Sequence, residues 1–315
     1  MGDLIKFILI LTFEIPAIFV SILIFLHFAV HHESRSKLKN HGWFILLLVN
    51  FIQLTVDLPM PMSFYYINRI WTKTNAYCVW WTWFEFSLNT IGLFLMSWIS
   101  IQRHLFIFYP QTIFGNTWKK WILHILPIIL CLSWTPLFYF IIVVLSPYCV
   151  TIWDFNSVIC GIPCYFTANF IGQFDFIFNI AFPVMMIMFA NVTLIIRVIY
   201  QKRSRHQTIH WQRHRRMVLQ LWIVSSLYMA CWLPMTITQL IQITLMPSFM
   251  IDQLETILFI VYFTPLLLPI ICLSVLPELL TKIRSFIRKS TRDNRVHVAA
   301  FNGQMKRTTA KITIQ

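Results

Sequence analysis

Seven long apolar stretches dominate the sequence and leave few folds open to the chain. They cover residues 7–30, 43–66, 79–100, 121–145, 170–199, 218–245 and 257–276. Each is close to or above the roughly 20 residues that an α-helix needs to cross about 30 Å of hydrocarbon. The stretches are continuous and rich in Leu, Ile and Phe, whereas a transmembrane barrel needs short alternating segments. We therefore predict an all-α membrane protein with a bundle of seven transmembrane helices.

Positive charge is distributed unevenly between alternate connections. Of the 25 Lys and Arg residues, 22 lie in or beside the first, third and fifth connections and the C-terminal tail, and Lys6, Arg69 and Lys73 lie on the other side. The positive-inside rule predicts that the cation-rich side is cytoplasmic, and seven crossings then place the N-terminus outside. This topology explains the formal net charge of +14, with the cations resting on anionic membrane lipid. The loops are too short for a basic or catalytic domain, so we expect no nucleic-acid binding.

The third stretch carries polar residues at both of its ends. Cys78 precedes it and Arg103 follows 25 residues later, and between them Glu85 and Asn89 stand four residues apart. On a helix this spacing places side chains on one face. Glu85 and Arg103 are 18 positions apart, which is about five turns, or ~27 Å. The pattern predicts an acid near one end of the helix and a base at the other.

The base of this stretch lies in a motif that resembles the rhodopsin-like (class A) G-protein-coupled receptors. Gln102-Arg103-His104 is similar to the Asp/Glu-Arg-Tyr motif with which that family engages its G protein, and Pro110 follows it. Because Gln102 has no charge, it cannot form the salt bridge that the family's acid makes with the arginine.

The resemblance continues in the later stretches. Cys231-Trp232-Leu233-Pro234 is similar to the family's Cys-Trp-x-Pro, in which the tryptophan forms the floor of the ligand pocket and the proline kinks the helix. Pro269 lies in a degraded form of Asn-Pro-x-x-Tyr, and Asn50 replaces the aspartate of the family's sodium site. The resemblance covers nearly the whole chain and assigns coupling or switching roles to Arg103, Gln102, Pro110, Trp232, Pro234 and Pro269.

The resemblance also implies a disulfide bond. In the family, the cysteine at the outer tip of the third helix pairs with the second extracellular loop. Here Cys78 would pair with Cys160 or, as the second choice, with Cys164, leaving two loop cysteines to bond each other. An oxidising extracellular environment favours such bonds over zinc binding.

Membership of the family would make the chain a plasma-membrane receptor that passes the binding of an extracellular ligand to a heterotrimeric G protein. It would be neither an enzyme nor dependent on a cofactor. The receptor domain would span residues 1–289 and end in a short amphipathic eighth helix at 277–289. Residues 290–315 would form a disordered cytoplasmic tail.

Among the carboxylates within the stretches, Asp57, Glu85 and Asp175 each fall in the outer half of their helix. Ionisable side chains inside a membrane are costly and suggest a functional site. By resemblance, Glu85 occupies the position at which amine receptors pair an acid with the ligand. The predicted ligand-binding residues, which would line a negative cavity opening outward, are Glu85, Asn89, Asp175, Asn179, Trp232, Gln239 and Tyr262. A negative and aromatic lining favours a cation, so we predict an amine or a basic peptide as the ligand.

Other interpretations of the same residues compete with this one. The carboxylates could instead be protonated or hydrogen-bonded to neighbouring helices. A seven-helix transporter or channel could use them to bind a coupling ion or a proton. A retinal-binding opsin is disfavoured, because Schiff-base attachment of retinal needs a lysine inside the seventh stretch and residues 257–276 contain none. His206, His210 and His214 share a helical spacing, but no thiolate or carboxylate accompanies them and we predict no metal site.

Overall fold

The computed structural model describes the greater part of the chain, and this part contains helices and no strands. The described residues are 2–30, 38–108, 118, 121–146, 149–167, 169–204, 211–246, 249–250 and 253–275. The chain divides into two compact units, Met1–Cys272 and Leu273–Gln315, and the helical bundle belongs to the first. The expected eighth helix at 277–289, the tail at 290–315, Pro110, His206 and His210 lie outside the described residues.

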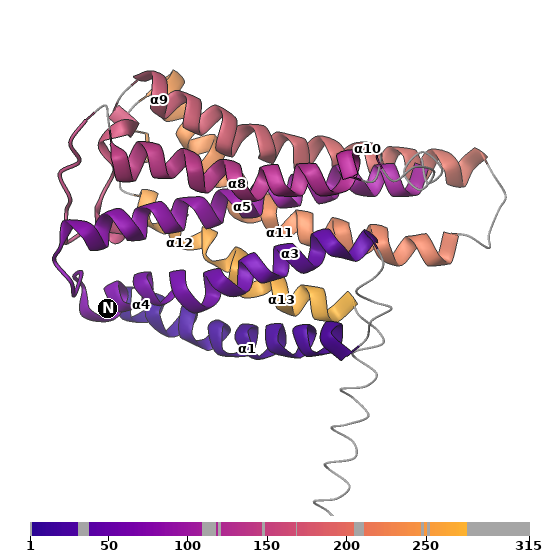
Figure 1. Ribbon diagram of the computed structural model, residues 1–315, viewed down its shortest axis with the longest axis horizontal. Helices are drawn as coiled ribbons and strands as arrows, with labels where there is room; N and C mark the ends of the chain where they lie inside the picture. Colours follow the sequence, from indigo (N-terminus) through magenta and orange to yellow (C-terminus); the bar gives the residue numbers. More distant parts are fainter. Residues whose placement is uncertain are drawn as a thin grey trace, which may run out of the picture. The chain divides into compact units, whose positions relative to one another are not determined.

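Seven helices in the described residues are long and apolar enough to cross a membrane, as the sequence predicts. They are Gly2–Val30, Asn40–Ile67, Asn75–Leu105, Trp121–Leu145, Phe170–Arg197, Leu219–Thr244 and Leu254–Leu273. Several contain internal changes of helix type. In chain order the labelled elements of Figure 1 and their short companions are α1 (Gly2–Val30), α3 (Leu38–Ile52), η1 (Gln53–Asp57), α4 (Pro59–Ile67), α5 (Asn75–Phe108), η2 (Trp121–Ile125), α8 (Leu126–Tyr139), η3 (Phe140–Leu145), η4 (Val158–Cys160), η5 (Cys164–Thr167), α9 (Asn169–Phe174), η6 (Asp175–Ala181), α10 (Phe182–Ser204), α11 (Trp211–Thr244), α12 (Leu254–Val261) and α13 (Phe263–Val275).

Wide π-helical turns precede prolines that lie inside three of the spans. The π segments η1, η2 and η6 each end two residues before a proline, at Pro59, Pro127 and Pro183. A proline has no N–H, and its ring clashes with the carbonyl four residues back, so an α-helical hydrogen bond cannot form there. A π turn re-satisfies the freed groups. In η1, for example, Leu58 N donates to Gln53 O at 2.9 Å, five residues back.

The helix α5 is the most deeply buried of the seven. In the most apolar 18-residue segment of this span, 67% of the residues are buried inside the protein. The corresponding share is 28% for α1 and for the span that contains α8. It packs against α3, α8 and α10 and also contacts α11 and the π segments η1, η3 and η6. Glu85 and Arg103 are 3% and 4% exposed, so both ends of the predicted polar face point into the bundle.

Two disulfides tie the connection between η3 and α9 together. Cys78 at the start of α5 bonds Cys160, which was the first of the two partners left open by the sequence. Cys149 bonds Cys164. We call the end of the bundle at Cys78 the disulfide end and the opposite end, at Arg103, the arginine end.

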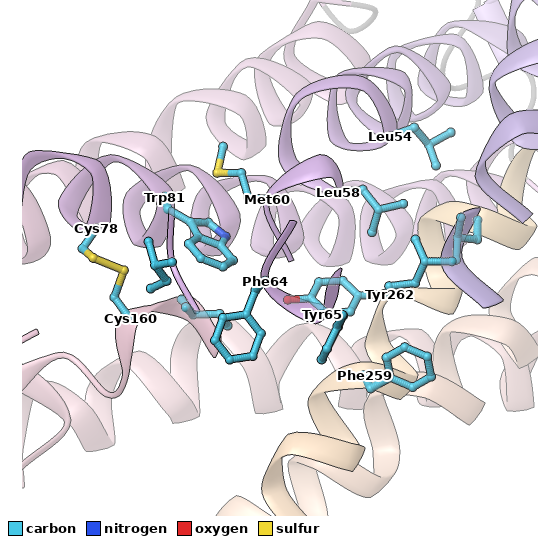
Figure 2. Packing of buried hydrophobic residues seen from close by; sticks show 14 of the residues in the cluster. Leu54, Leu58, Met60, Phe64, Tyr65, Cys78, Trp81, Cys160, Phe259 and Tyr262 are labelled. Carbon is cyan, nitrogen blue, oxygen red and sulfur yellow. A yellow bond between two sulfur atoms is a disulfide. The ribbon is translucent and has the colours of Figure 1, made fainter. Parts of the chain in front are cut away.

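The apolar core at the disulfide end draws on helices that are far apart in sequence. Figure 2 shows Trp81 of α5 near the Cys78–Cys160 bond, and Phe64 and Tyr65 of α4 together with Phe259 of α12. Between α12 and α13 lies Tyr262, which is 2% exposed. Pro265 follows in the first turn of α13 and cannot donate to the carbonyl four residues back, which explains the break.

Candidate functional site

A cavity of about 770 Å³ opens at the disulfide end. Its wall combines the loop at 156–163 with side chains from α9, η6, α11 and α12. Aromatic residues contribute much of it, namely Phe64, Phe86, Phe166 and Phe176. Polar groups come from Asn156, Ser157, Gln173, Gln239 and Gln242. Among the lining residues that the structure describes, Glu255 is the one with a charged side chain.

A short hydrogen-bonded loop forms one wall of the cavity. Asp154 N donates to Cys160 O at 2.9 Å, and the Asp154 carboxylate accepts hydrogen bonds from the Ser157 hydroxyl and from Asn156 N. Both bonds lower the pKa of Asp154 below its ordinary value, and the bond from Ser157 has the larger effect. Gly161 closes the loop with φ +88°, a backbone region that residues with a side chain rarely adopt. The loop is thus shaped by its own polar groups.

Beside the cavity, an ion pair joins the first span to the seventh. Lys6 Nζ lies 2.5 Å from Glu255 Oε1 and 3.6 Å from Asp3 Oδ1. It also stands 5.1 Å from the centroid of the Tyr65 ring, a cation–π distance. The side chain of Glu255 is 47% exposed, compared with 20% for Lys6. The glutamate can therefore be reached from the cavity while it is paired.

Glu85 is buried and is not among the residues that line the cavity. The Tyr262 hydroxyl donates to Glu85 Oε1 at 2.7 Å. One turn further along α5, Asn89 Oδ1 accepts a hydrogen bond of 2.8 Å from Gln53 Nε2 on η1. The structure therefore brings Glu85 together with Tyr262 and places Asn89 against the second span.

Asp175 lies in a second and separate polar cluster. Its carboxylate accepts hydrogen bonds from the Tyr139 hydroxyl at 2.8 Å, from Asn179 Nδ2 at 2.7 Å and from the Tyr165 hydroxyl at 3.0 Å. Asn179 Oδ1 in turn accepts a bond of 3.0 Å from Trp134 Nε1. Burial, and after it the negative charge of Asp175, raise the pKa of the Tyr165 hydroxyl above its usual value. Tyr165 thus stays a neutral donor that ties the loop to η6.

The seven predicted ligand-binding residues do not share one wall. Of these residues, Gln239 lines the cavity, whereas the acids Glu85 and Asp175 are in the two clusters described above. Trp232 is 7% exposed and stands two residues before Pro234, inside α11. The ligand contacts assigned to these residues from the sequence stay predictions.

The arginine end holds a chain of polar contacts around the predicted coupling residues. Arg103 lies in α5 with its guanidinium carbon 5.7 Å from the centroid of the Trp43 ring. Gln102, 3% exposed, hydrogen-bonds His124 Nδ1. His124 Nε2 in turn lies 3.2 Å from His41 Nδ1. The uncharged Gln102 therefore links the third span to the fourth and, through the histidine pair, to the second.

The comparison with family models decides the identity. The model described as 7 transmembrane receptor (rhodopsin family) matches residues 21–272. The chain belongs to this family. A comparison with curated proteins finds no match.

Membership of the rhodopsin family makes this chain a signalling receptor of the plasma membrane that crosses the bilayer several times. Such receptors take an extracellular ligand and a G protein as partners and are not enzymes. The disulfides and the seven spans of the receptor agree with this assignment.

Sequence reasoning missed three charged residues of the receptor. Glu255 and Lys6 lie just outside the apolar stretches at 257–276 and 7–30, where an ionisable side chain carries no membrane cost and gives no signal of a site. Glu14 lies inside the first stretch and is 7% exposed. A search for every acid within two turns of a stretch boundary would have found Glu255.

Proposed function

We propose that the receptor binds a cationic ligand, a small amine or a basic peptide, in the cavity at the disulfide end. The observation that carries this proposal is the placement of Glu255, the one charged side chain among the described residues of the cavity lining. A volume of about 770 Å³ suits a small molecule or the end of a peptide. The phenylalanine faces and amide groups around it would hold a cation and its hydrogen-bonding neighbours.

Binding at Glu255 would act directly on the contact between the first and last helices. Lys6 occupies the carboxylate at 2.5 Å, and a ligand cation would compete with it. Lys6 also makes a cation–π contact with the Tyr65 ring, so its displacement would loosen α1 from α4 as well as from α12. A ligand shifts a conformational equilibrium only if it binds one state better. Competition with an ion pair between helices supplies such a difference.

Glu85 offers a second and deeper acid for the same ligand. The sequence resemblance makes it the pairing acid, although the hydroxyl of Tyr262 occupies its Oε1. A ligand that reaches Glu85 would have to pass beyond the cavity and compete for this hydrogen bond. The two acids thus make different predictions, and separate substitutions distinguish them.

At the other end of the bundle, we assign contact with the G protein to Arg103. The arginine is 4% exposed and stacks on Trp43, so a change in helix packing is needed before it can meet a partner. The Gln102 to His124 contact would be broken by that change. The excess of cations on this side supports a cytoplasmic location, with the N-terminus outside the cell.

A panel of amines and basic peptides, applied to cells that express the full chain, tests this proposal through G-protein dissociation. With an active compound in hand, Glu255→Gln should lower its potency at least tenfold, because the charge-assisted contact is lost. Asp3→Asn is the matched control, since Asp3 also pairs Lys6 but does not line the cavity. Its potency should stay unchanged.

Two other outcomes would redirect the proposal. A loss of potency in Glu85→Gln with normal potency in Glu255→Gln would move the ligand to the deeper acid. Saturable uptake or current without any G-protein response would favour the transporter or channel interpretation instead.

A further inference from the structure

Two buried carboxyl groups face each other between the second and third spans. The hydrogen bond from Gln53 to Asn89 fixes the register of η1 against α5. Asp57 lies four residues after Gln53, and Glu85 lies four residues before Asn89. Because consecutive spans run in opposite directions, both acids stand one turn beyond this contact, toward the disulfide end. Asp57 and Glu85 therefore form a pair.

Most of the oxygen atoms in this pair have no hydrogen-bond partner. Asp57 is 1% exposed and Glu85 3% exposed. Within the part of the chain that the structure describes, both oxygens of Asp57 and Oε2 of Glu85 accept no hydrogen bond. The polar side chains beside the pair, Gln53 and Trp81, lie outside hydrogen-bonding geometry to it. Tyr262 supplies the single donor, to Glu85 Oε1.

Among the residues that the structure describes around the pair, none supplies a positive charge to it. The titratable side chains facing it are Tyr65 of α4 and Tyr262, both shown in Figure 2. On α1, which also packs against η1, Glu14 is buried and Lys6 is already paired with Glu255 and Asp3. Two adjacent carboxylates in an apolar interior cannot both stay ionised without a counter-charge. The pair therefore needs a positively charged ligand.

The space around the pair favours the smallest such ligand. Neither Asp57 nor Glu85 lines the cavity of about 770 Å³. A hydrated metal ion or a ligand ammonium bound in that cavity would therefore not contact the pair. A proton needs no cavity. We propose that Asp57 and Glu85 are a proton-binding site. In this site the Asp57 carboxyl keeps a proton and, through it, donates a hydrogen bond to Glu85 Oε2.

The existing contacts decide which acid carries the proton. Glu85 already accepts a hydrogen bond from Tyr262, which stabilises its charged form. Asp57 accepts none, so it gains most from being neutral and donating. The result is a continuous line of hydrogen bonds from Tyr262 to Glu85 and from Asp57 to Glu85. It joins the second, third and seventh spans through one proton.

Infrared spectroscopy of the purified full-length receptor in lipid nanodiscs at neutral pH tests the site directly, because a protonated carboxyl absorbs apart from a carboxylate. The difference spectrum of wild type minus Asp57→Asn should contain a protonated carboxyl band. The spectrum of wild type minus Asp175→Asn should lack it. In Glu85→Gln the Asp57 band should persist at a shifted frequency, because its acceptor changes from a carboxylate to an amide.

Thermal melting of the same proteins adds a second readout. Asp57→Asn should keep the wild-type melting midpoint because its amide can donate to Glu85 in place of the acid. Asp57→Leu, which has similar size and no donor, should melt at a lower temperature. If Asp57→Leu does not fold, the spectra of Asp57→Asn still decide.

Two results would overturn the proposal. One is a wild-type minus Asp57→Asn spectrum with a carboxylate band and no protonated carboxyl band. The other is a rise of the wild-type melting midpoint on adding NaCl, but not on adding choline chloride, that disappears in Asp57→Asn. The second result would make the pair a site for a metal ion.

Discussion

Two buried acidic sites in the same half of the bundle are built in opposite ways. Asp175 accepts three hydrogen bonds, from Tyr139, Tyr165 and Asn179. The Asp57–Glu85 pair receives one, from Tyr262. Yet both Asp175 and Asp57 lie on a π segment that ends two residues before a proline. Asp57 ends its π segment and Asp175 begins its own, and the contrast in hydrogen bonding lies in the donors that other elements bring.

The contrast separates a structural acid from one that is suited to a ligand. A carboxylate with a full set of donors can stay charged in an apolar interior, and its hydrogen bonds join neighbouring elements. A pair of acids with unpartnered oxygens carries an unmet electrostatic cost, which only a bound positive charge can remove. Burial and position in a span are shared by both sites and do not distinguish them.

The largest expected effect comes from removing the charge at the satisfied site. In Asp175→Asn an amide replaces the carboxylate that faces the two tyrosine hydroxyls. Its NH2 group cannot accept their hydrogen bonds, and its oxygen is a weaker acceptor than a carboxylate oxygen. Each unsatisfied buried donor costs roughly 1–3 kcal/mol, so the loss of stability should be about 3 kcal/mol or more. A thermal melt of the purified receptor measures it. Asp154→Asn, which changes an exposed acid of the nearby loop, is the control.

A smaller effect is expected at the unsatisfied site when its single donor is removed. Tyr262→Phe deletes the hydrogen bond to Glu85, and a bond to a charged group contributes about 2 kcal/mol. The matched control is Tyr65→Phe, because the Tyr65 hydroxyl is buried without a partner in the described structure. A melt in which both variants lose equal stability would show that the Tyr262 contact has no special role.

Next in size is the loss of one donor among three. Tyr165→Phe should destabilise the receptor by about 1 kcal/mol, since Asp175 keeps Tyr139 and Asn179. Combined with Asp175→Asn, the two losses should not add, because both changes remove the same contact. Additive losses in a double-mutant cycle would argue against a direct bond between the tyrosine and the aspartate.

The smallest effect concerns an acid outside the membrane. Hydrogen bonds lower the pKa of Asp154, so its folded form holds the proton less well than the unfolded chain does. Its contribution to stability is therefore present above the ordinary aspartate pKa of about 3.9 and is lost as the pH falls through the lowered value. The difference in melting midpoint between wild type and Asp154→Asn should shrink as the pH falls below about 4. A difference that is constant with pH would contradict this. The effect is small because the group is exposed.

The architecture could be predicted from the sequence because it depends on long, continuous patterns. Seven apolar runs predict seven spans, and the spacing of Cys78 and Arg103 predicts the helix between them. The polar face of that helix is buried at both ends, as the periodicity requires. Such features need only local spacing and the cost of polar groups in lipid.

The arrangement of the site could not be predicted in the same way. Whether Asp175 meets a ligand or a set of donors depends on Tyr165, and this residue comes from a loop without any periodic signal. The sequence grouped Glu85 with Asp175, whereas long-range packing places them in different clusters. Glu255 reaches the cavity from the first turn of α12, outside the apolar run.

The wide turns before Pro59, Pro127 and Pro183 also affect how the spans can be aligned with those of other proteins. Each π turn accommodates one extra residue, and one residue on an α-helix corresponds to a rotation of about 100°. If the residues of a span are numbered by their distance from its proline, the numbers of residues beyond such a turn are therefore displaced by one position. In this receptor, equivalences for side chains beyond η1 and η6 should be drawn from superposed backbones.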